Sequence, residues 1–135
     1  MTKLNRRKFI RGAGIVMVSG KSLFTNSNQS KEMKNVFVHH VYFWLNNPDS
    51  EEDRLALLAG LKKLSAVTTI QSFHIGKPAT TNREVIDTSY AASWLALFAN
   101  KADQDSYQTD PIHLKFVEEC SHLWKKVIVY DSVNV

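Results

Sequence analysis

The chain has 135 residues, of which 44% are hydrophobic, 10% aromatic and 22% charged. This size and composition allow one small globular domain with an appendage and exclude two full domains. Five glycines and three prolines are too few for a collagen or a Pro-rich linker, and a mean hydropathy of -0.24 excludes a polytopic membrane protein. The single cysteine, Cys120, rules out an intramolecular disulfide and a cysteine-rich zinc site.

The formal net charge of +4 is unevenly distributed along the chain. Residues 1–34 carry eight basic side chains and one acidic side chain, whereas residues 35–135 carry nine basic and twelve acidic ones. The part expected to fold, residues 35–135, therefore has a net charge of -3. Because a nucleic-acid-binding face needs clustered Lys and Arg, we expect no nucleic-acid partner.

The basic N-terminal segment contains Asn5-Arg6-Arg7-Lys8-Phe9-Ile10-Arg11, which resembles the bacterial twin-arginine export motif. A moderately apolar stretch at residues 12–20 is too short to span a bilayer, and a polar stretch follows at residues 26–32. The resemblance implies that residues 1–34 are an export signal with a flexible linker. The mature protein would then be periplasmic or otherwise exported, without stable membrane insertion. The alternative is a disordered basic tail on a cytoplasmic protein, which the lack of a clean A-x-A cleavage site favours.

The folded part is expected to begin with a strand over residues 36–45, which is apolar on both alternating faces. An amphipathic helix follows over residues 50–65, with Ser50 as its N-cap. Residues 67–75 and 89–99 are predicted to form the second and third strands. The alanines of the third segment also permit a helix there.

Residues 100–109 predict a short helix, and Asp110-Pro111 predicts the start of another. An Asp at the N-cap accepts a backbone N–H, and a Pro at the first helical position has no N–H to leave unpaired. The apolar stripe of this helix includes Cys120 and extends to Leu123 or Trp124, and residues 126–133 form the last strand. The order β-α-β-β-α-β predicts an α+β fold of the ferredoxin-like type, an antiparallel sheet with helices on one face.

The first strand also predicts an assembly. A subunit of this size covers one face of its sheet with helices, yet this strand is hydrophobic on both sides. Exposing Phe37, Val41 and Phe43, or the side chains opposite them, would leave a large apolar patch in water. We therefore expect a two-fold homodimer with its sheets face to face, although the sequence also permits a heterodimer.

Several landmarks within residues 36–133 coincide with one family. They are His40-Val41-Tyr42-Phe43, Asp87-Thr88-Ser89-Tyr90, Phe98, Tyr107, Pro111, His113, Phe116 and Asp131. This pattern resembles the stress-responsive α/β barrel, or Dabb, domain, with the first-strand motif displaced by one place. The family commonly has a His where this chain has Asp110. The resemblance implies a dimeric α/β barrel. Most members have no established reaction, and a minority are cofactor-free polyketide cyclases whose pocket between sheet and helices is lined by Tyr and His.

The candidate catalytic residues are His113, Tyr107 and His40. The positive end of the helix dipole disfavours a charged His113 imidazole, which leaves a neutral base. Tyr107 has a hydroxyl suited to a developing enolate, and His40 would approach from the sheet. Each of the three also has a structural interpretation: a half-buried histidine, a core ring with its hydroxyl at the surface, and strand packing. The spacing of the histidines indicates no metal site, and no cofactor is expected.

Two functions follow from these residues. The first is an exported, dimeric barrel that binds a small apolar molecule or serves the response to envelope stress. The second is a cofactor-free, cyclase-like lyase that uses Tyr107 and His113. A third hypothesis, a haem-degrading monooxygenase, has less support, because no histidine stands at a position distinctive of a haem ligand. An enclosed pocket at Tyr107, His113 and His40 would favour the enzyme, and a pocket filled by Trp44, Trp94 or Phe116 would disfavour it.

Overall fold

The computed structural model describes residues 29–135, and its folded unit spans Met33–Val135. The twin-arginine-like motif lies outside the described residues. Within residues 29–135, no helix is long and apolar enough to cross a membrane. The elements in chain order are β1 (Phe37–Leu45), α1 (Glu51–Leu64), β2 (Ser72–Gly76), β3 (Ala92–Phe98), α2 (Lys101–Thr109), α3 (Pro111–Cys120), the short 3-10 helix η2 (Ser121–Leu123) and β4 (Trp124–Val133).

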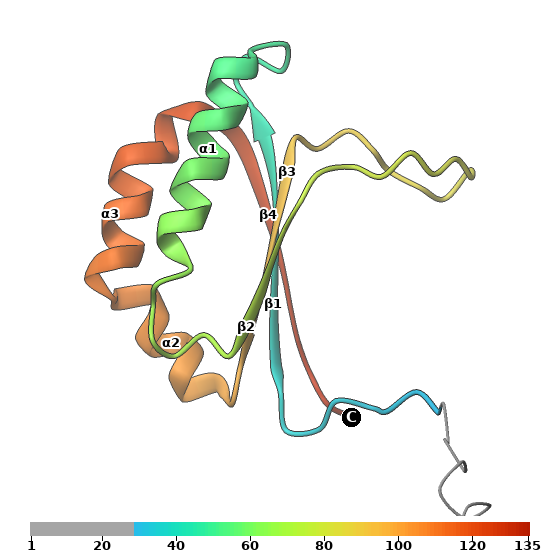
Figure 1. Ribbon diagram of the computed structural model, residues 1–135, viewed down its shortest axis with the longest axis vertical. Helices are drawn as coiled ribbons and strands as arrows, with labels where there is room; N and C mark the ends of the chain where they lie inside the picture. The colour runs from blue at the N-terminus through green and yellow to red at the C-terminus, as the bar shows by residue number, and fades with distance from the viewer. Residues whose placement is uncertain (1–28) are drawn as a thin grey trace, which may run out of the picture. The chain divides into compact units, whose positions relative to one another are not determined.

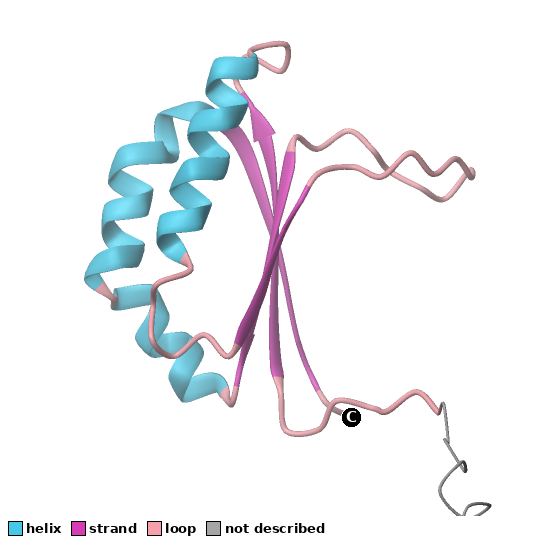
Figure 2. Ribbon diagram, in the orientation of Figure 1, coloured by secondary structure: helices cyan, strands magenta, loops and turns pink. Residues whose placement is uncertain are grey.

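The four strands form one antiparallel sheet in the order β2-β3-β1-β4. The helices α1, α2 and α3 all lie on one side of this sheet (Figures 1 and 2). The segment between β2 and β3, residues 77–91, projects from the sheet on the side away from the helices (Figure 1). This arrangement confirms the predicted ferredoxin-like α+β fold. Of the two structures that the sequence permitted for residues 89–99, the chain forms the strand, β3, and not a helix.

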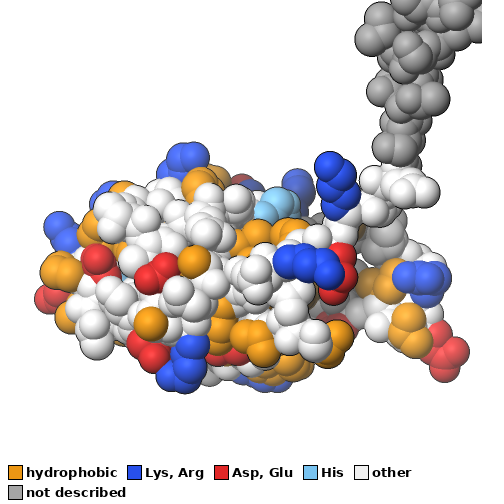
Figure 3. Space-filling model, turned by 90° about the horizontal axis from the view of Figure 1, so that it is seen from below, with side chains coloured by type: hydrophobic (Ala, Val, Ile, Leu, Met, Phe, Trp, Pro, Cys, Tyr) orange, Lys and Arg blue, Asp and Glu red, His pale blue; other side chains and the backbone are white. Residues whose placement is uncertain are grey.

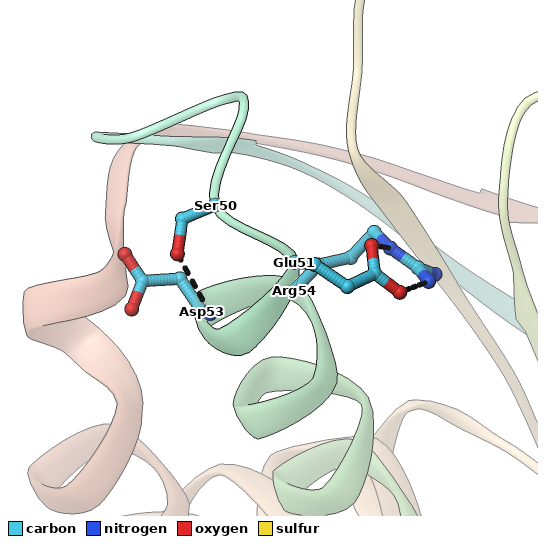
Figure 4. Close-up of polar contacts among 4 residues, drawn as sticks. All are labelled: Ser50, Glu51, Asp53 and Arg54. Atoms are coloured by element: carbon cyan, nitrogen blue, oxygen red, sulfur yellow. Dashed lines mark hydrogen bonds and ion pairs between the residues drawn. The ribbon is translucent and has the colours of Figure 1, made fainter.

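Helix α1 begins where the sequence places its cap. The Ser50 hydroxyl accepts a hydrogen bond from the backbone N–H of Asp53 at 3.1 Å (Figure 4). Glu51 forms an ion pair with Arg54, one turn later, which Figure 4 also shows. The last turn of the helix contains Lys62 and Lys63. Acidic residues in the first turn and basic residues in the last complement the helix dipole, so local chemistry sets both ends of the helix.

The second strand is shorter than predicted, because residues 67–71 form turns. Backbone hydrogen bonds join Val67 to Leu64 and Ile70 to Val67, each at 3.2 Å. The Val67 side chain is nevertheless buried beneath the end of α1. The β-branched Val67 therefore suggested a strand at this position, whereas the chain forms a turn here and buries the same side chain in the core.

Helix α3 begins as predicted, since the Asp110 carboxylate accepts the backbone N–H of Ile112 at 2.8 Å and Pro111 occupies the first turn. It ends at Cys120 rather than at 123 or 124. Asn46, just after β1, bonds to the backbone carbonyls of residues 122, 123 and 124. Because these carbonyl groups bond to Asn46, they are not free to continue the hydrogen bonds of a helix. Strand β4 therefore starts at Trp124, two residues earlier than predicted.

The two faces of the sheet differ in cover. On β1, every odd-numbered side chain from Phe37 to Leu45 is buried beneath the helices, and every even-numbered one is half-buried on the other side. We call this second side the open face. The strand register assigns to it Val38, His40, Tyr42 and Trp44 of β1, Ser72, His74 and Gly76 of β2, Ser93, Leu95 and Leu97 of β3, and Lys126, Ile128, Tyr130 and Ser132 of β4.

The helix layer packs closely on the covered face. Cys120 is buried on the apolar stripe of α3, as predicted. A Cβ at Gly60 of α1 would lie 2.5 Å from the Cys120 sulfur, so the glycine lets the two helices approach one another. On the side seen in Figure 3, Lys and Arg side chains lie among Asp and Glu rather than in a single basic patch.

Candidate functional site

A cavity of about 140 Å³ lies between the covered face of the sheet and helices α2 and α3. Strands β1, β3 and β4 supply one wall, and helices α2 and α3 with the last residue of α1 supply the other. Its polar lining comes from His39, Tyr107, Gln108 and His113. The rest of the lining is apolar and consists of Val41, Phe43, Leu64, Trp94, Phe116, Val117, Trp124, Val127 and Val129. Trp94 and Phe116 therefore line this space and do not fill it.

Tyr107, on α2, is 1% exposed and reaches the cavity from the helix side. Its hydroxyl oxygen accepts a hydrogen bond from the indole N–H of Trp94 at 3.1 Å. Burial raises the pKa of Tyr107 well above its usual range, so the phenol stays protonated at neutral pH. Because Trp94 uses the oxygen as an acceptor, the phenolic proton is available to a partner inside the cavity.

His113, on the first turn of α3, packs its ring against Tyr107 with the ring centroids 4.7 Å apart. Its Nδ1 atom is buried and meets no partner among the described residues at full hydrogen-bond geometry, although the Gln108 backbone lies close enough to act on the ring. Burial is the main cause that lowers the pKa of His113, and it outweighs the raising effect of a contact with the Gln108 backbone. The imidazole is therefore neutral at neutral pH, with an unpaired ring nitrogen beside the tyrosine.

His39 and Asp131 form a second polar pair next to these rings. Nδ1 of His39 lies 2.6 Å from a carboxylate oxygen of Asp131, and the His39 side chain is buried whereas Asp131 is partly exposed. The His39 ring meets the Tyr107 ring edge-on at 5.6 Å. A carboxylate on Nδ1 orients the ring and directs the other nitrogen, Nε2, away from β4.

The structure does not bring His40 to this cavity. His40 is on the open face, where the hydroxyl of Tyr42 lies 3.3 Å from its Nδ1 atom, and the sheet separates it from Tyr107 and His113. Its neighbour His39 takes the place expected for it. The alternation of side chains along β1 could have predicted this placement. Tyr42 and Trp44, which suit a half-exposed face, lie two and four residues after His40 and therefore on the same face as His40.

Asp110, which stands where the resemblance leads one to expect a histidine, has a structural task. Its carboxylate caps α3, and the residue is outside the cavity lining. In the part of the chain that the structure describes, no group of three or more His, Cys, Asp or Glu is placed to hold a metal ion. The side chains of His39, Tyr107 and His113 offer proton transfer and hydrogen bonding.

Fold and site together define a ferredoxin-like subunit with a small, Tyr- and His-lined cavity between sheet and helices. The model of the Dabb family, described as the stress responsive A/B barrel domain, matches residues 37–134, and the chain belongs to this family. The comparison with curated proteins gives no match.

Solved structures share the fold at low sequence identity. A Dabb-family protein from Mesorhizobium loti is 24% identical, with a TM-score of 0.62 over 74% of this chain and 97% of that one. A protein of unknown function from Bacteroides fragilis, described as dimeric and ferredoxin-like, is 16% identical, with a TM-score of 0.61 over 76% of this chain and 100% of that one. The hydroxynitrile lyase of Passiflora edulis is 15% identical, with a TM-score of 0.64 over 76% of this chain and 96% of that one.

Proposed function

We propose that the protein is a homodimer that binds a small, uncharged and largely apolar molecule in the cavity of each subunit. The observation that carries the proposal is the buried Nδ1 atom of His113, which has no hydrogen-bond partner among the described residues and belongs to a ring packed against the Tyr107 ring. A buried polar atom without a hydrogen bond costs about 1–3 kcal/mol, so a ligand that pairs with it gains that interaction.

The size and lining of the cavity limit the class of ligand. At about 140 Å³ it is below the usual range of ligand pockets. It is close to the cavity of about 150 Å³ that accommodates benzene in another protein. No Lys or Arg of the described residues lines it, so a carboxylate or phosphate would enter without a cation. A single ring with one carbonyl or hydroxyl group fits both the volume and the polar atoms.

The open face supports the homodimer. Tyr42, Trp44, Tyr90 and Tyr130 lie around a hollow of about 340 Å³ on this side, with Lys126 over the Trp44 ring. Aromatic side chains of this kind are enriched in protein interfaces. Structural neighbours from several bacteria are described as dimeric. Packing two open faces together would cover the side of β1 that the helices leave uncovered.

The test of ligand binding compares the wild-type protein with His113→Ala. Each protein is purified under native conditions, and its bound small molecules are released and identified by mass spectrometry. Benzaldehyde and benzoate are then titrated as matched probes, one neutral and one charged. We expect wild type to bind benzaldehyde in preference to benzoate. His113→Ala should bind benzaldehyde at least tenfold more weakly, because neutral His113 with its proton on Nδ1 donates a hydrogen bond to the aldehyde oxygen.

His122→Ala is the matched control, because His122 is exposed and lies outside the cavity lining. It should bind benzaldehyde as wild type does. Equal binding of benzaldehyde by wild type and His113→Ala, or stronger binding of benzoate than of benzaldehyde by wild type, would contradict the proposal.

A second candidate, a cofactor-free lyase, is favoured by the pairing of a neutral base with a protonated phenol. In such a reaction, His113 would take a proton from the substrate and Tyr107 would donate a hydrogen bond to the oxygen on which negative charge develops. Mandelonitrile tests this with the same proteins. Cleavage takes the hydroxyl proton, breaks the carbon–carbon bond and releases benzaldehyde and hydrogen cyanide. A lyase produces benzaldehyde in a His113-dependent way, and a binding protein does not.

We also propose that the protein is exported, on the basis of the twin-arginine-like residues alone. Replacing Arg6 and Arg7 with Lys keeps the charge and removes the motif. We expect this variant to accumulate in the cytoplasm, as measured by cell fractionation and immunoblotting, while a Lys3→Arg control is exported normally. Unchanged export of the Lys variant would argue for a signal of another kind or for none.

A further inference from the structure

The open face contains two histidines on neighbouring positions of the sheet. His40 of β1 and His74 of β2 both pair with Leu95 of β3, so they flank the same leucine from opposite sides. His40 is also in contact with Tyr42, whose ring centroid lies 4.4 Å from its own. In the proposed dimer, the two-fold axis doubles this pair and brings four imidazoles into one interface.

Among the described residues, no carboxylate forms a hydrogen bond or ion pair with the ring of His40, whose contacts are with Tyr42 and the other histidines. Among the strand residues that the structure places on the open face, Lys126 has the sole permanent charge, and it is positive. The groups that face His40 are Tyr42 from its own strand and His74 from β2, while β4 places Tyr130 opposite it. His39, the adjacent residue, points to the covered face, where Asp131 already binds it.

A carboxylate that lines the hollow on this face is already engaged. Asp87, on the segment between β2 and β3, accepts the backbone N–H of Ser89 at 2.8 Å and lies near Lys126. An imidazolium at His40 or His74 would therefore be buried beneath a second copy with cations or neutral groups around it. Burial, together with His74 and His39, already lowers the pKa of His40 in the single subunit.

We propose that the open face is a proton-sensitive interface: two copies associate while His40 and His74 are neutral and separate when these histidines become protonated. The inference rests on the proposed homodimer. The sign follows from linkage. Because the dimer holds these imidazoles neutral, it binds fewer protons than two free subunits. The dissociation constant therefore rises as the pH falls below the pKa of these histidines in the free subunit.

The experiment measures the dimer dissociation constant by sedimentation at pH 7.5 and pH 5.5, at equal ionic strength and with EDTA present. One pH unit below an ordinary histidine pKa, each imidazole that must stay neutral weakens the dimer by about tenfold. The interface contains two copies of each histidine, and His40 begins with a lowered pKa and contributes less. We therefore expect the dissociation constant of the wild type to rise by at least about 100-fold in total. Circular dichroism at pH 5.5 should show that the released subunits are folded.

The variants separate this inference from the homodimer itself. His40→Asn with His74→Asn should form dimers whose dissociation constant is the same at both pH values, and each single variant should have an intermediate dependence. His122→Asn, an exposed histidine outside the open face, should behave as wild type. A monomer at pH 7.5 would overturn the homodimer. A pH-independent wild-type dimer, an unfolded subunit at pH 5.5 or an unchanged pH dependence in both single variants would overturn the inference alone.

Discussion

We expect Leu97→Asp to convert the protein into a folded monomer. Leu97 lies on the open face of β3, between Val38 of β1 and Ser72 of β2. The two-fold symmetry of the proposed dimer would bury two such carboxylates in one apolar interface. Burying an unpaired charge costs several kcal/mol, so we expect the dissociation constant to rise at least 1,000-fold, or about 4 kcal/mol. Sedimentation velocity over a range of protein concentrations measures this change.

Leu114→Asp provides a matched control for that substitution. Leu114 is on α3, in the helix layer, and is 55% exposed. The chemical change is the same, but the new carboxylate stays in water, so the variant should remain dimeric. If Leu97→Asp sediments as wild type, the dimer uses another surface. If both variants dissociate, the helix layer takes part in the assembly.

The elements with strong local chemistry were predictable from the sequence. The caps at Ser50 and Asp110 placed the starts of α1 and α3 correctly, because each cap depends on residues two or three positions away. The antiparallel sheet with helices on one face also followed, since the β-α-β-β-α-β element order leaves little topological freedom. The end of α3 was not predictable, because Asn46, 76 residues before His122, sets it through hydrogen bonds. The start of β2 was not predictable either, because residues 67–71 form turns in which the Val67 side chain is buried.

The candidate site was predictable in part. Tyr107 and His113 were identified by their resemblance to a family pattern, and the structure places their rings in contact. The pair of His39 with Asp131 was missed, because it joins residues 92 positions apart through the register of β1 with β4. His39 and His40, adjacent on β1, lie on opposite faces of the sheet, and a strand that is apolar on both faces gives a weak indication of which histidine faces the helices.

The second prediction concerns Tyr107, whose hydroxyl has both a structural and a chemical partner. Tyr107→Phe leaves the buried indole N–H of Trp94 without its acceptor, so we expect the free energy of unfolding to fall by about 1–3 kcal/mol. The same change removes the hydroxyl donor from the cavity. Binding of benzaldehyde should therefore weaken at least tenfold, as measured by titration at a temperature where the variant is fully folded.

Trp94→Phe separates these two roles, because it removes the indole N–H and leaves the Tyr107 hydroxyl in the cavity. We expect this variant to lose stability through the smaller side chain and still to bind benzaldehyde. In the Trp94→Phe background, Tyr107→Phe should cost about 1 kcal/mol less than in the wild type, since no orphaned N–H remains. If the Tyr107→Phe variant binds benzaldehyde as tightly as the wild type, Tyr107 is a core residue whose hydroxyl bonds only to Trp94. An equal stability cost in both backgrounds would instead show that the hydrogen bond between the two side chains contributes nothing to folding.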